Sequence, residues 1–273
     1  VSLTKKQKND FSETIKEEPQ THIVFNNKSS LKNYNFGFLK TTNISAIYKK
    51  RSIIEDIQGY NNGEWWVQDL ASMMPIYLLD KIENKQVADL CSAPGGKLFQ
   101  LITKGAIVTS FEKNDNRVKL MKQNLQRLNL KCNIVIKDVL KIESKKLFDV
   151  VILDSPCSSL GTIRRNPEIF FRESKPNLKK ITNIQKNLLN KASKLLKKNG
   201  ILIYMVCSFL EDEGKNIVKE FLSLNKNFSL NKFSNKHKNV FIDKEGFYFV
   251  LPKKLKNNIL IDGFFSAKIV KND

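Results

Sequence analysis

The sequence predicts an α/β protein whose mostly parallel β-sheet is covered by helices on both faces. Between residues 86 and 206, short apolar runs alternate with longer stretches in which apolar residues recur at helical spacing. This alternation favours parallel strands, because each helix returns the chain to the same end of the sheet. A polar or reactive residue also follows each apolar run, as expected where ligands bind at the carboxyl edge of an open sheet.

Five apolar runs predict the strands of this sheet. They span residues 87–90, 106–111, 134–136, 150–153 and 201–206. Helical spacing then predicts two of the connecting helices. The apolar face of one consists of Val118, Met121, Leu125 and Leu128, and that of the other consists of Ile181, Ile184, Leu188, Ala192 and Leu195.

A third helix is predicted directly after the last strand. Ser208 and Glu211 have the spacing of a capping box, in which two side chains satisfy free amide groups at a helix start. Cys207 would then lie at the helix N-terminus, where the helix dipole favours a thiolate. The apolar face of this helix would consist of Ile217, Val218, Phe221 and Leu222.

The first part of the chain is polar and only weakly periodic. Residues 22–25 predict a short strand there, and residues 53–57 form an apolar patch. We therefore expect a small α+β unit over residues 1–58 and a larger domain over residues 59–273, which is long enough to bury a core. A start at Val1 rather than at methionine is also what a piece of a longer protein would show.

Composition excludes several classes of protein. No apolar run approaches the roughly 18 residues that a membrane helix needs, and the first residues lack the apolar core of a signal peptide. We expect a cytoplasmic protein that acts as a monomer. The four cysteines lie 41, 25 and 50 residues apart without a CxxC pair, and only two histidines accompany them. These spacings fit neither a disulfide framework nor a zinc site, so no metal is expected.

The net charge of +20 is compatible with a polyanionic partner but does not establish one. Only six of the 47 basic residues are arginine, and asparagine is abundant. An AT-rich genome would give the same enrichment in lysine and asparagine to any protein. The charge alone therefore leaves the partner open.

The loop DLCSAPGGKL, after the first strand of the sheet, indicates a ligand site. Gly95 and Gly96 permit a tight turn from strand to helix and the close approach of a bound molecule. Glu112 ends the next strand, where a carboxylate can accept hydrogen bonds from both hydroxyls of a ribose. On these two features alone, a plain strand-to-helix turn with an unrelated surface acid remains the alternative.

Two cysteines follow apolar strands in equivalent positions. Cys157 lies in the turn DSPCSSLG, and Cys207 follows the last strand. If the two strands are neighbours, the two sulfur atoms share one cleft with Asp154. A single free cysteine is more often a small buried apolar residue, which is what we expect of Cys132.

Four motifs together resemble the RsmB/Sun family of RNA (cytosine-C5)-methyltransferases. They are DLCSAPGGK, DSPCSSLGTIRRNPEI, VCSFLEDEG and the terminal DGFFSAKI, and the segment GYNNGEWWVQDLAS resembles the lead-in to the family's catalytic domain. The similarity extends over most of residues 59–271 and is weak over residues 1–58. It implies a Rossmann-like class I methyltransferase fold with a mostly parallel seven-stranded sheet. RsmB-type members carry an N-terminal helical RNA-binding domain that this sequence lacks, so either the chain is a fragment or the small leading unit docks RNA.

The resemblance also implies S-adenosyl-L-methionine as cofactor. Glu112 would bind its ribose and Asp138 its adenine, and Asp154 would lie close to both the cofactor and the target base. The residues that would surround its methionine part are Cys91, Ser92, Ala93, Pro94, Gly95, Gly96 and Lys97.

In this family the attacking sulfur belongs to the CS motif, here Cys207. Its thiolate would add to C6 of cytosine and make C5 electron-rich enough to accept a methyl group. Asp154 would hold or donate the proton at the N3 edge of the ring. Cys157 would assist loss of the C5 proton or departure of Cys207. DNA cytosine methyltransferases instead place the nucleophile in a PC motif, which would make Cys157 the attacker.

The expected partner is RNA. A stacked cytosine must be exposed or flipped, at a cost of about a few kcal/mol that contacts to the RNA backbone offset. Arg164 and Arg165 follow the DSPC turn and are expected to bind RNA, whereas Trp65 and Trp66 are expected to pack between the domains. Ribosomal RNA is the expected substrate, and transfer RNA is an alternative. The non-enzymatic alternative is an RNA-binding ribosome-assembly factor that has lost the activity.

Overall fold

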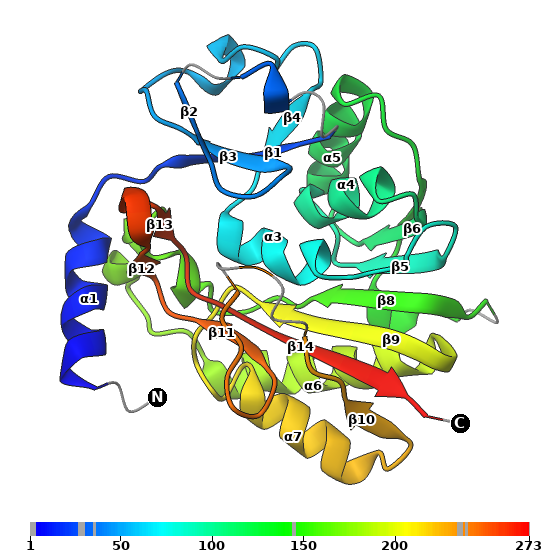
Figure 1. The fold of residues 1–273 in the computed structure, drawn as a ribbon. Coiled ribbons are helices and arrows are strands. Elements are labelled where there is room, and N and C mark those ends of the chain that lie inside the picture. Colours follow the sequence, from blue (N-terminus) through cyan, green and yellow to red (C-terminus); the bar gives the residue numbers. More distant parts are fainter. Residues whose placement is uncertain are drawn as a thin grey trace.

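A small antiparallel sheet is stacked on a larger mixed sheet that is flanked by helices (Figure 1). This computed structural model describes residues 4–26, 31–34, 37–143, 146–233, 237 and 240–272. The N-terminal helix α1 (Lys5–Lys16) lies at the side of the molecule, against a hairpin formed by β12 (Lys253–Lys254) and β13 (Leu260–Ile261).

The larger sheet confirms the predicted α/β fold. In the described part of the chain it has eight strands, of which five are parallel. In spatial order the parallel strands are β9 (Leu196–Val206), β8 (Phe148–Asp154), β5 (Gln86–Leu90), β6 (Ile107–Glu112) and β7 (Asn133–Ile136). Each of them overlaps one of the five predicted runs.

Three antiparallel strands complete the larger sheet beside β9, so the sheet is mixed and has one strand more than the seven expected. These strands are β14 (Phe264–Lys271), β10 (Phe228–Leu230) and β11 (Tyr248–Val250). The strand β14 pairs with β9 along most of its length. The C-terminal segment is therefore a structural part of the sheet, next to the strand that leads to Cys207.

Alternate side chains along the parallel strands enter two different cores. Val87 and Ile152 belong to one core, and Ala88 and Val151 belong to the other. The helices of the first core are α3 (Leu70–Tyr77), α4 (Gly96–Thr103) and α5 (Asp115–Arg127), and those of the second are α6 (Leu178–Lys194) and α7 (Lys215–Leu224). Both faces of the sheet are thus covered, as predicted.

The buried face of α6 differs from the prediction. Its buried residues are Gln185, Leu188, Leu189, Ala192 and Ser193. Leu188 and Ala192 are buried as expected, but Ile184 is exposed. The neighbouring Gln185 is buried in its place. Its side-chain amide donates a hydrogen bond to the carbonyl oxygen of Pro156 at 2.9 Å, so a polar contact to the loop after β8 determines which side of α6 faces inward.

The small sheet has the strand order β2-β3-β1-β4, with every pair antiparallel. Its strands are β1 (Thr21–Phe25), β2 (Phe38–Lys40), β3 (Ser45–Tyr48) and β4 (Trp65–Val67). The predicted strand over 22–25 is β1, and the apolar patch over 53–57 contains a single 3-10 turn (Ile54–Asp56). Because β4 belongs to this sheet, the boundary expected between residues 58 and 59 falls inside the small unit.

Trp65 and Trp66 are both buried, but only Trp66 packs between the two parts of the chain, as expected. Trp65 is fully buried in the small sheet's own core. Trp66 joins the core of the larger domain, where its ring lies edge-on to Phe99 with the centroids 5.7 Å apart. The two faces of β4 therefore connect the small sheet with the larger domain.

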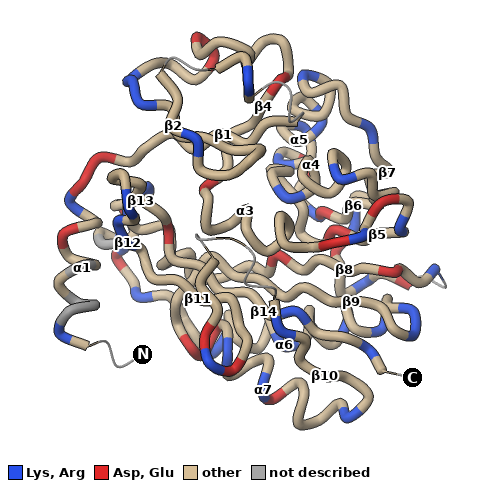
Figure 2. Tube along the Cα trace, in the orientation of Figure 1, with Lys and Arg blue, Asp and Glu red and all other residues tan. Residues whose placement is uncertain are grey.

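The basic residues do not gather on one face. Lys and Arg are spread over the small sheet, the helices and the ends of the strands (Figure 2). No helix in the described residues is both long and apolar enough to cross a membrane. Nor do those residues include a group of three side chains that could hold a metal ion.

A buried cluster of charges joins three distant parts of the chain. The guanidinium of Arg164 lies 3.2 Å from Asp69 and 3.0 Å from Asp262, and all three side chains are essentially inaccessible to solvent. Asp69 is the N-cap of α3 and accepts a hydrogen bond from the backbone N–H of Ala71. Because a buried charge is costly without its partners, Arg164 joins the start of α3, the loop after β8 and the C-terminal segment.

We expect Arg164→Met to destabilise the protein by about 3–5 kcal/mol, because it leaves the buried carboxylate of Asp69 without its arginine and that of Asp262 with Arg165 alone. Urea unfolding followed by circular dichroism measures this change. Arg51→Met is the matched control, since Arg51 also pairs with a carboxylate, that of Glu18, but on the exposed surface. Equal, small shifts of the unfolding midpoint in both variants would contradict the structural role of the cluster.

Candidate active site

Most of the residues expected to react or to bind a cofactor lie along one edge of the larger sheet. Glu112 and Asp154 are the last residues of β6 and β8. Cys91 and Cys207 directly follow β5 and β9. The four strands are parallel and adjacent in the order β9, β8, β5, β6, so their carboxyl ends meet at the same edge (Figure 1).

Cys157 and Cys207 face each other, with their Sγ atoms 3.3 Å apart. The strands before them, β8 and β9, pair in parallel, with Asp154 opposite Met205. Both cysteines are free and partly buried. The expectation that two neighbouring strands bring the sulfur atoms into one cleft agrees with this geometry.

The hydrogen bond between the two thiols gives them different acidities. It lowers the pKa of Cys207, and a contact with the Ser159 hydroxyl at 3.7 Å and the charge of Lys97 lower it further, against the effects of burial and of Asp154. The same hydrogen bond, together with burial, raises the pKa of Cys157 well above its ordinary value. This geometry therefore favours Cys207 as the more acidic of the two thiols and Cys157 as the donor to it.

The predicted helix start beside Cys207 is wrong. The helix α7 begins only at Lys215, and its N-cap, Gly214, makes no side-chain capping contact. Ser208 and Glu211 do not form a capping box, because the Ser208 hydroxyl instead donates to the carboxylate of Glu213 at 2.6 Å. Residues 208–214 form turns and bends, so a neighbouring thiol, and not a helix dipole, makes Cys207 acidic.

Lys97 and Asp154 form an ion pair beside the cysteines. The Lys97 Nζ atom lies 2.7 Å from Asp154 Oδ2, and Lys97 is largely buried. Burial lowers the pKa of Lys97, but the Asp154 carboxylate more than offsets this effect, so the net shift is upward. A permanent positive charge thus lies between the strand that ends in Asp154 and the helix that begins at Gly96.

The glycine loop is held by its own contacts. Gly95 has a φ of +113°, and a Cβ atom there would lie 2.4 Å from the Phe99 ring, so only glycine fits. Arg117 donates a hydrogen bond to the carbonyl oxygen of Ala93. The thiol of Cys91 packs against the second core, where burial, followed by Glu112, raises its pKa to about 12. The side chain of Cys91 is therefore partly buried against this core.

A cavity of about 180 Å³ lies between these loops. The predicted residues that line it are Ser92, Pro94, Gly96, Lys97, Asp154 and Arg165. Asp89 also lines it and was not predicted. Both carboxylate oxygens of Asp89 are buried and accept no hydrogen bond from the residues that the structure describes, and burial raises its pKa well above the ordinary value.

Glu112 and Asp138 lie outside this cavity, at the ends of the next two strands. Glu112 Oε1 accepts hydrogen bonds from the backbone N–H groups of Lys113 and Asn114, at 2.9 and 3.0 Å. Its Oε2 atom is buried and accepts no hydrogen bond within the described part of the chain. Asp138 accepts a hydrogen bond from the backbone N–H of Leu140 and lies 3.5 Å from Lys113.

The two arginines expected to bind RNA differ in their surroundings. Arg165 has a side chain that is 39% exposed, and it lines the cavity while donating to Asp262 at 2.6 Å. Arg164 is fully buried in its ion pairs with Asp69 and Asp262. The expectation that Arg164 lies at an RNA-binding surface is therefore contradicted, because its guanidinium is buried and forms ion pairs with two carboxylates of the protein.

Two glycines that sequence reasoning missed bring the reactive loops together. The N–H of Gly161 donates to the carbonyl oxygen of Cys207 at 3.0 Å, and the N–H of Gly263 donates to the carbonyl oxygen of Gly161 at 2.8 Å. A Cβ atom on Gly161 would lie 2.0 Å from the Gly263 carbonyl oxygen. Both glycines occur in the motifs quoted above, but only the fold reveals that their backbones touch.

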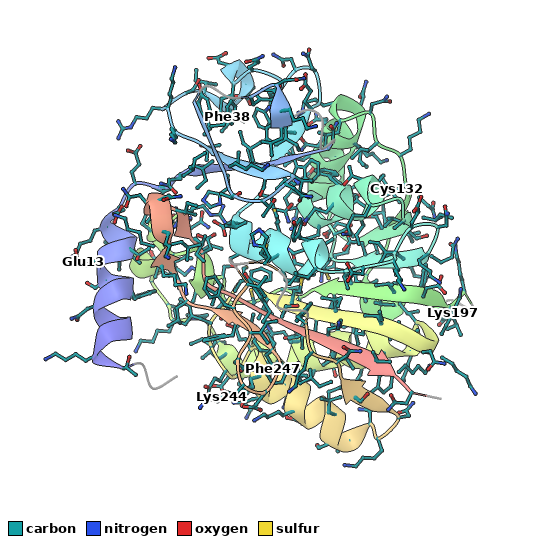
Figure 3. The ribbon with its side chains drawn as sticks, in the orientation of Figure 1. Glu13, Phe38, Cys132, Lys197, Lys244 and Phe247 are labelled. Carbon is teal, nitrogen blue, oxygen red and sulfur yellow. The ribbon has the colours of Figure 1, made fainter. Side chains whose placement is uncertain are left out.

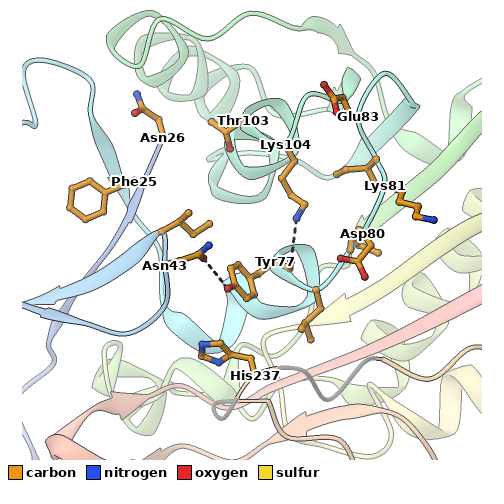
Figure 4. A pocket seen from close by; sticks show the side chains of 14 residues that line it. Phe25, Asn26, Asn43, Tyr77, Asp80, Lys81, Glu83, Thr103, Lys104 and His237 are labelled. Carbon is orange, nitrogen blue, oxygen red and sulfur yellow. Dashed lines mark hydrogen bonds between the residues drawn. The ribbon is translucent and has the colours of Figure 1, made fainter. Parts of the chain in front are cut away.

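A larger cavity, of about 830 Å³, lies elsewhere (Figure 4). It is formed where α3 and α4 end, and Tyr77 there donates to Asn43 at 2.9 Å while Lys104 donates to the Tyr77 carbonyl at 3.2 Å. None of the predicted site residues lines it. Cys132 also lies away from the reactive edge, just before β7 (Figure 3), where it packs against the first core.

Comparisons with known proteins agree with this arrangement. The profile of the family described as 16S rRNA methyltransferase RsmB/F matches residues 76–270. The chain is 30% identical over 223 residues to the probable ribosomal RNA small subunit methyltransferase B of Coxiella burnetii, covering 74% of this chain and 52% of the relative. It is 32% identical over 220 residues to the corresponding protein of Photorhabdus laumondii, covering 79% and 49%. The chain thus spans about half the length of the curated relatives it matches.

A solved structure shows the same fold. The crystal structure of NSun6 from Pyrococcus horikoshii with SFG superposes with a TM-score of 0.83 at 17% identity, covering 98% of this chain and 95% of that chain. The family profile covers more than half of the chain and includes both cysteine loops and the glycine loop. The chain belongs to the RsmB/F family of 16S rRNA methyltransferases.

Proposed function

We propose that this protein methylates C5 of a cytosine in ribosomal RNA, through a covalent bond between Cys207 and C6 of the ring. The observation that supports this most is the 3.3 Å contact between Cys157 and Cys207, which makes Cys207 the more acidic thiol. Cytosine C5 is a weak nucleophile, and a sulfur anion that adds to C6 overcomes that weakness. The names of the family and of the curated relatives support ribosomal RNA as the substrate.

The residues at the strand ends fit S-adenosyl-L-methionine. The Oε2 atom of Glu112 accepts no hydrogen bond in the described part of the chain, although Arg117 lies 3.7 Å from it, and it suits a ribose hydroxyl. The carboxyl group of Asp89, which also accepts no hydrogen bond within the described residues, suits an ammonium group. The start of α4 at Gly96 offers backbone N–H groups to a carboxylate, as the first turn of a helix does. Asp138 ends the adjacent strand on the adenine side. When bound, this cofactor supplies the electrophilic methyl group.

Cys207 and Asp154 carry the addition step. The thiolate of Cys207 bonds to C6, and the electron pair of the C5–C6 double bond shifts toward C5 and the ring nitrogen N3. Asp154, beside the ammonium of Lys97 at 2.7 Å, is placed to accept a hydrogen bond from N3 once that nitrogen has taken a proton from solvent, which stabilises the protonated ring that accepts the electron pair. Lys97 and Asp154 thus act as one pair.

Cys157 changes its role once Cys207 has bonded to carbon. The hydrogen bond to Cys207 and the negative charge there both raise the pKa of Cys157. Both effects end when Cys207 becomes a thioether, and only burial and the charge of Glu213 then still raise this pKa, so Cys157 releases its proton to solvent more readily than before. The thiolate of Cys157 then accepts the C5 proton, the double bond re-forms, and Cys207 leaves as a thiolate that Cys157 again stabilises as hydrogen-bond donor.

An exposed aromatic ring lies near this site and suits RNA. Phe171 is 82% exposed and is the one exposed large aromatic side chain among the described residues. The next residue, Arg172, donates a hydrogen bond to the carbonyl oxygen of Ser158, which directly follows Cys157. Aromatic rings in such positions stack on nucleobases, which contributes about 1–3 kcal/mol per base. We assign Phe171 to a nucleotide that flanks the target cytosine, with Arg165 facing the target itself.

Variants of the cysteines test the proposed chemistry. We expect Cys207→Ala to abolish both methylation of unmodified 16S rRNA with tritiated S-adenosyl-L-methionine and the covalent protein–RNA complex on a denaturing gel. Cys157→Ala should accumulate that complex, because release is blocked after addition. Cys132→Ala is the matched control and should behave like the wild type, since Cys132 lies away from the reactive edge. The opposite pattern, with the complex lost in Cys157→Ala and trapped in Cys207→Ala, would reverse the assignment.

Phe171→Ala tests the stacking contact. We expect it to weaken RNA binding by about tenfold, in line with the loss of one stacked base, while Phe171→Tyr retains affinity. Fluorescence anisotropy with a labelled rRNA fragment measures both. Leu224→Ala is the control, because Leu224 is similarly exposed, at 74%, but lies at the end of α7. Equal affinity of Phe171→Ala and Leu224→Ala would remove Phe171 from the RNA-binding surface.

A further inference from the structure

We propose that Glu213 is a positioning residue that holds the Cys157 and Cys207 loops together and, through its charge, assigns different roles to the two thiols. The proposal rests on the proposed function for its catalytic meaning, but its structural basis is independent of RNA and cofactor. Glu213 is completely buried, although it belongs to a turn between β9 and α7. Sequence reasoning included it in the motif VCSFLEDEG but gave it no role.

The carboxylate of Glu213 binds the residue next to each cysteine. Its Oε1 atom accepts a hydrogen bond from the backbone N–H of Ser158 at 2.7 Å. Its Oε2 atom accepts hydrogen bonds from the hydroxyls of Ser158 and Ser208, at 2.5 and 2.6 Å. Ser158 follows Cys157, and Ser208 follows Cys207. A single carboxylate therefore fixes the spacing of two loops that come from different strands.

Glu213 is itself held in place by two other buried residues. The hydroxyl of Tyr204, in β9, donates to the backbone carbonyl of Glu213 at 2.6 Å. The side-chain amide of Gln185, in α6, lies 3.3 Å from Oε1 and also donates to Pro156 at 2.9 Å. These contacts explain why Gln185 occupies the buried face of α6 where an apolar residue was predicted. They fix the carboxylate from the helix and from the strand.

The buried charge of Glu213 has no ion-pair partner in the described residues, since only neutral donors surround it. A buried, unpaired carboxylate is costly, so its retention calls for a reason beyond stability. After the hydrogen bond with Cys207, burial and the charge of Cys207, the charge of Glu213 also raises the pKa of Cys157. It thereby favours Cys157 as the protonated partner and leaves the negative charge on Cys207.

Other titratable groups also lie close enough to act on Cys157 and Cys207. Lys97 lowers the pKa of Cys207 and Asp154 raises it. Tyr204 stays protonated, because burial raises its pKa well above the ordinary value. The charge of Glu213 also contributes to the raised pKa of Tyr204, but burial is the largest cause there and remains when Glu213 becomes glutamine. A change in the acidity of Cys157 therefore reports on the carboxylate.

Glu213→Gln tests this role, because the amide preserves the shape of the side chain and removes its charge. Alkylation by iodoacetamide across pH, mapped by mass spectrometry, measures the acidity of each cysteine. We expect alkylation of Cys157 to begin at lower pH than in the wild type, so that the difference between the pH ranges in which Cys157 and Cys207 react becomes smaller. We also expect kcat for rRNA methylation to fall by about tenfold, with KM for RNA unchanged within about twofold. Glu211→Gln is the matched control, since Glu211 lies on the same turn but is exposed.

Alkylation profiles equal to those of the wild type in folded Glu213→Gln would overturn the proposal, even if its melting temperature falls. If Glu213→Gln does not fold, Ser208→Ala is the second variant, because it removes one of the three closest hydrogen bonds to the Glu213 carboxylate. We expect alkylation of Cys157 in this variant also to begin at lower pH than in the wild type, by a smaller amount. Unchanged profiles in Ser208→Ala would then overturn it. Alkylation requires neither RNA nor cofactor, so shifted profiles in a protein that methylates no RNA would support Glu213 while refuting the proposed function.

Discussion

The hydrogen bond between two sulfur atoms 3.3 Å apart is the interaction on which the site depends. Two buried thiols in a shared cleft cannot both ionise easily, so whichever anion is better stabilised becomes the nucleophile. Ser159 and Lys97 favour the anion at Cys207, and Glu213 disfavours it at Cys157. In the proposed mechanism, the same coupling lets Cys157 become a base only after Cys207 has reacted. The proposed order of the chemical steps would then follow from electrostatics that exist before any substrate binds.

The fold maintains this contact through buried polar connections rather than through apolar packing alone. Glu213 joins the two cysteine loops through hydrogen bonds with Ser158 and Ser208. The backbone hydrogen bond between Gly161 and Gly263 joins these loops to the C-terminal strand. Arg164, buried between Asp69 and Asp262, joins that region to the start of α3. Charged and small residues therefore make the contacts between the motifs. The apolar cores on the two faces of the sheet hold the strands that precede these motifs.

Local apolar patterns predicted the parallel strands well, because a strand buried on both faces must be apolar whatever its neighbours are. They could not distinguish Arg164 from Arg165, since adjacent residues in a loop differ only in what the distant Asp69 and Asp262 offer them. The spacing of Ser208 and Glu211 fits a helix cap and also a turn, and here Glu213 competes successfully for the Ser208 hydroxyl. For a similar reason, Gln185 is buried and Ile184 is exposed, against the prediction from helical periodicity. The Gln185 side chain donates a hydrogen bond to the loop that carries Cys157, which an isoleucine could not do. Polar contacts between residues far apart in the sequence could therefore not be predicted from local patterns.

The most direct test identifies which sulfur bonds to the base. RNA that contains 5-fluorocytidine at the target position cannot lose the C5 substituent as a cation, so the covalent complex formed with S-adenosyl-L-methionine persists. Protease digestion and mass spectrometry of that complex from the unmodified protein locate the attached residue. The account predicts that the nucleotide is found on the peptide that contains Cys207. A nucleotide on the peptide that contains Cys157 would contradict the proposed distribution of the proton and the mechanism derived from it.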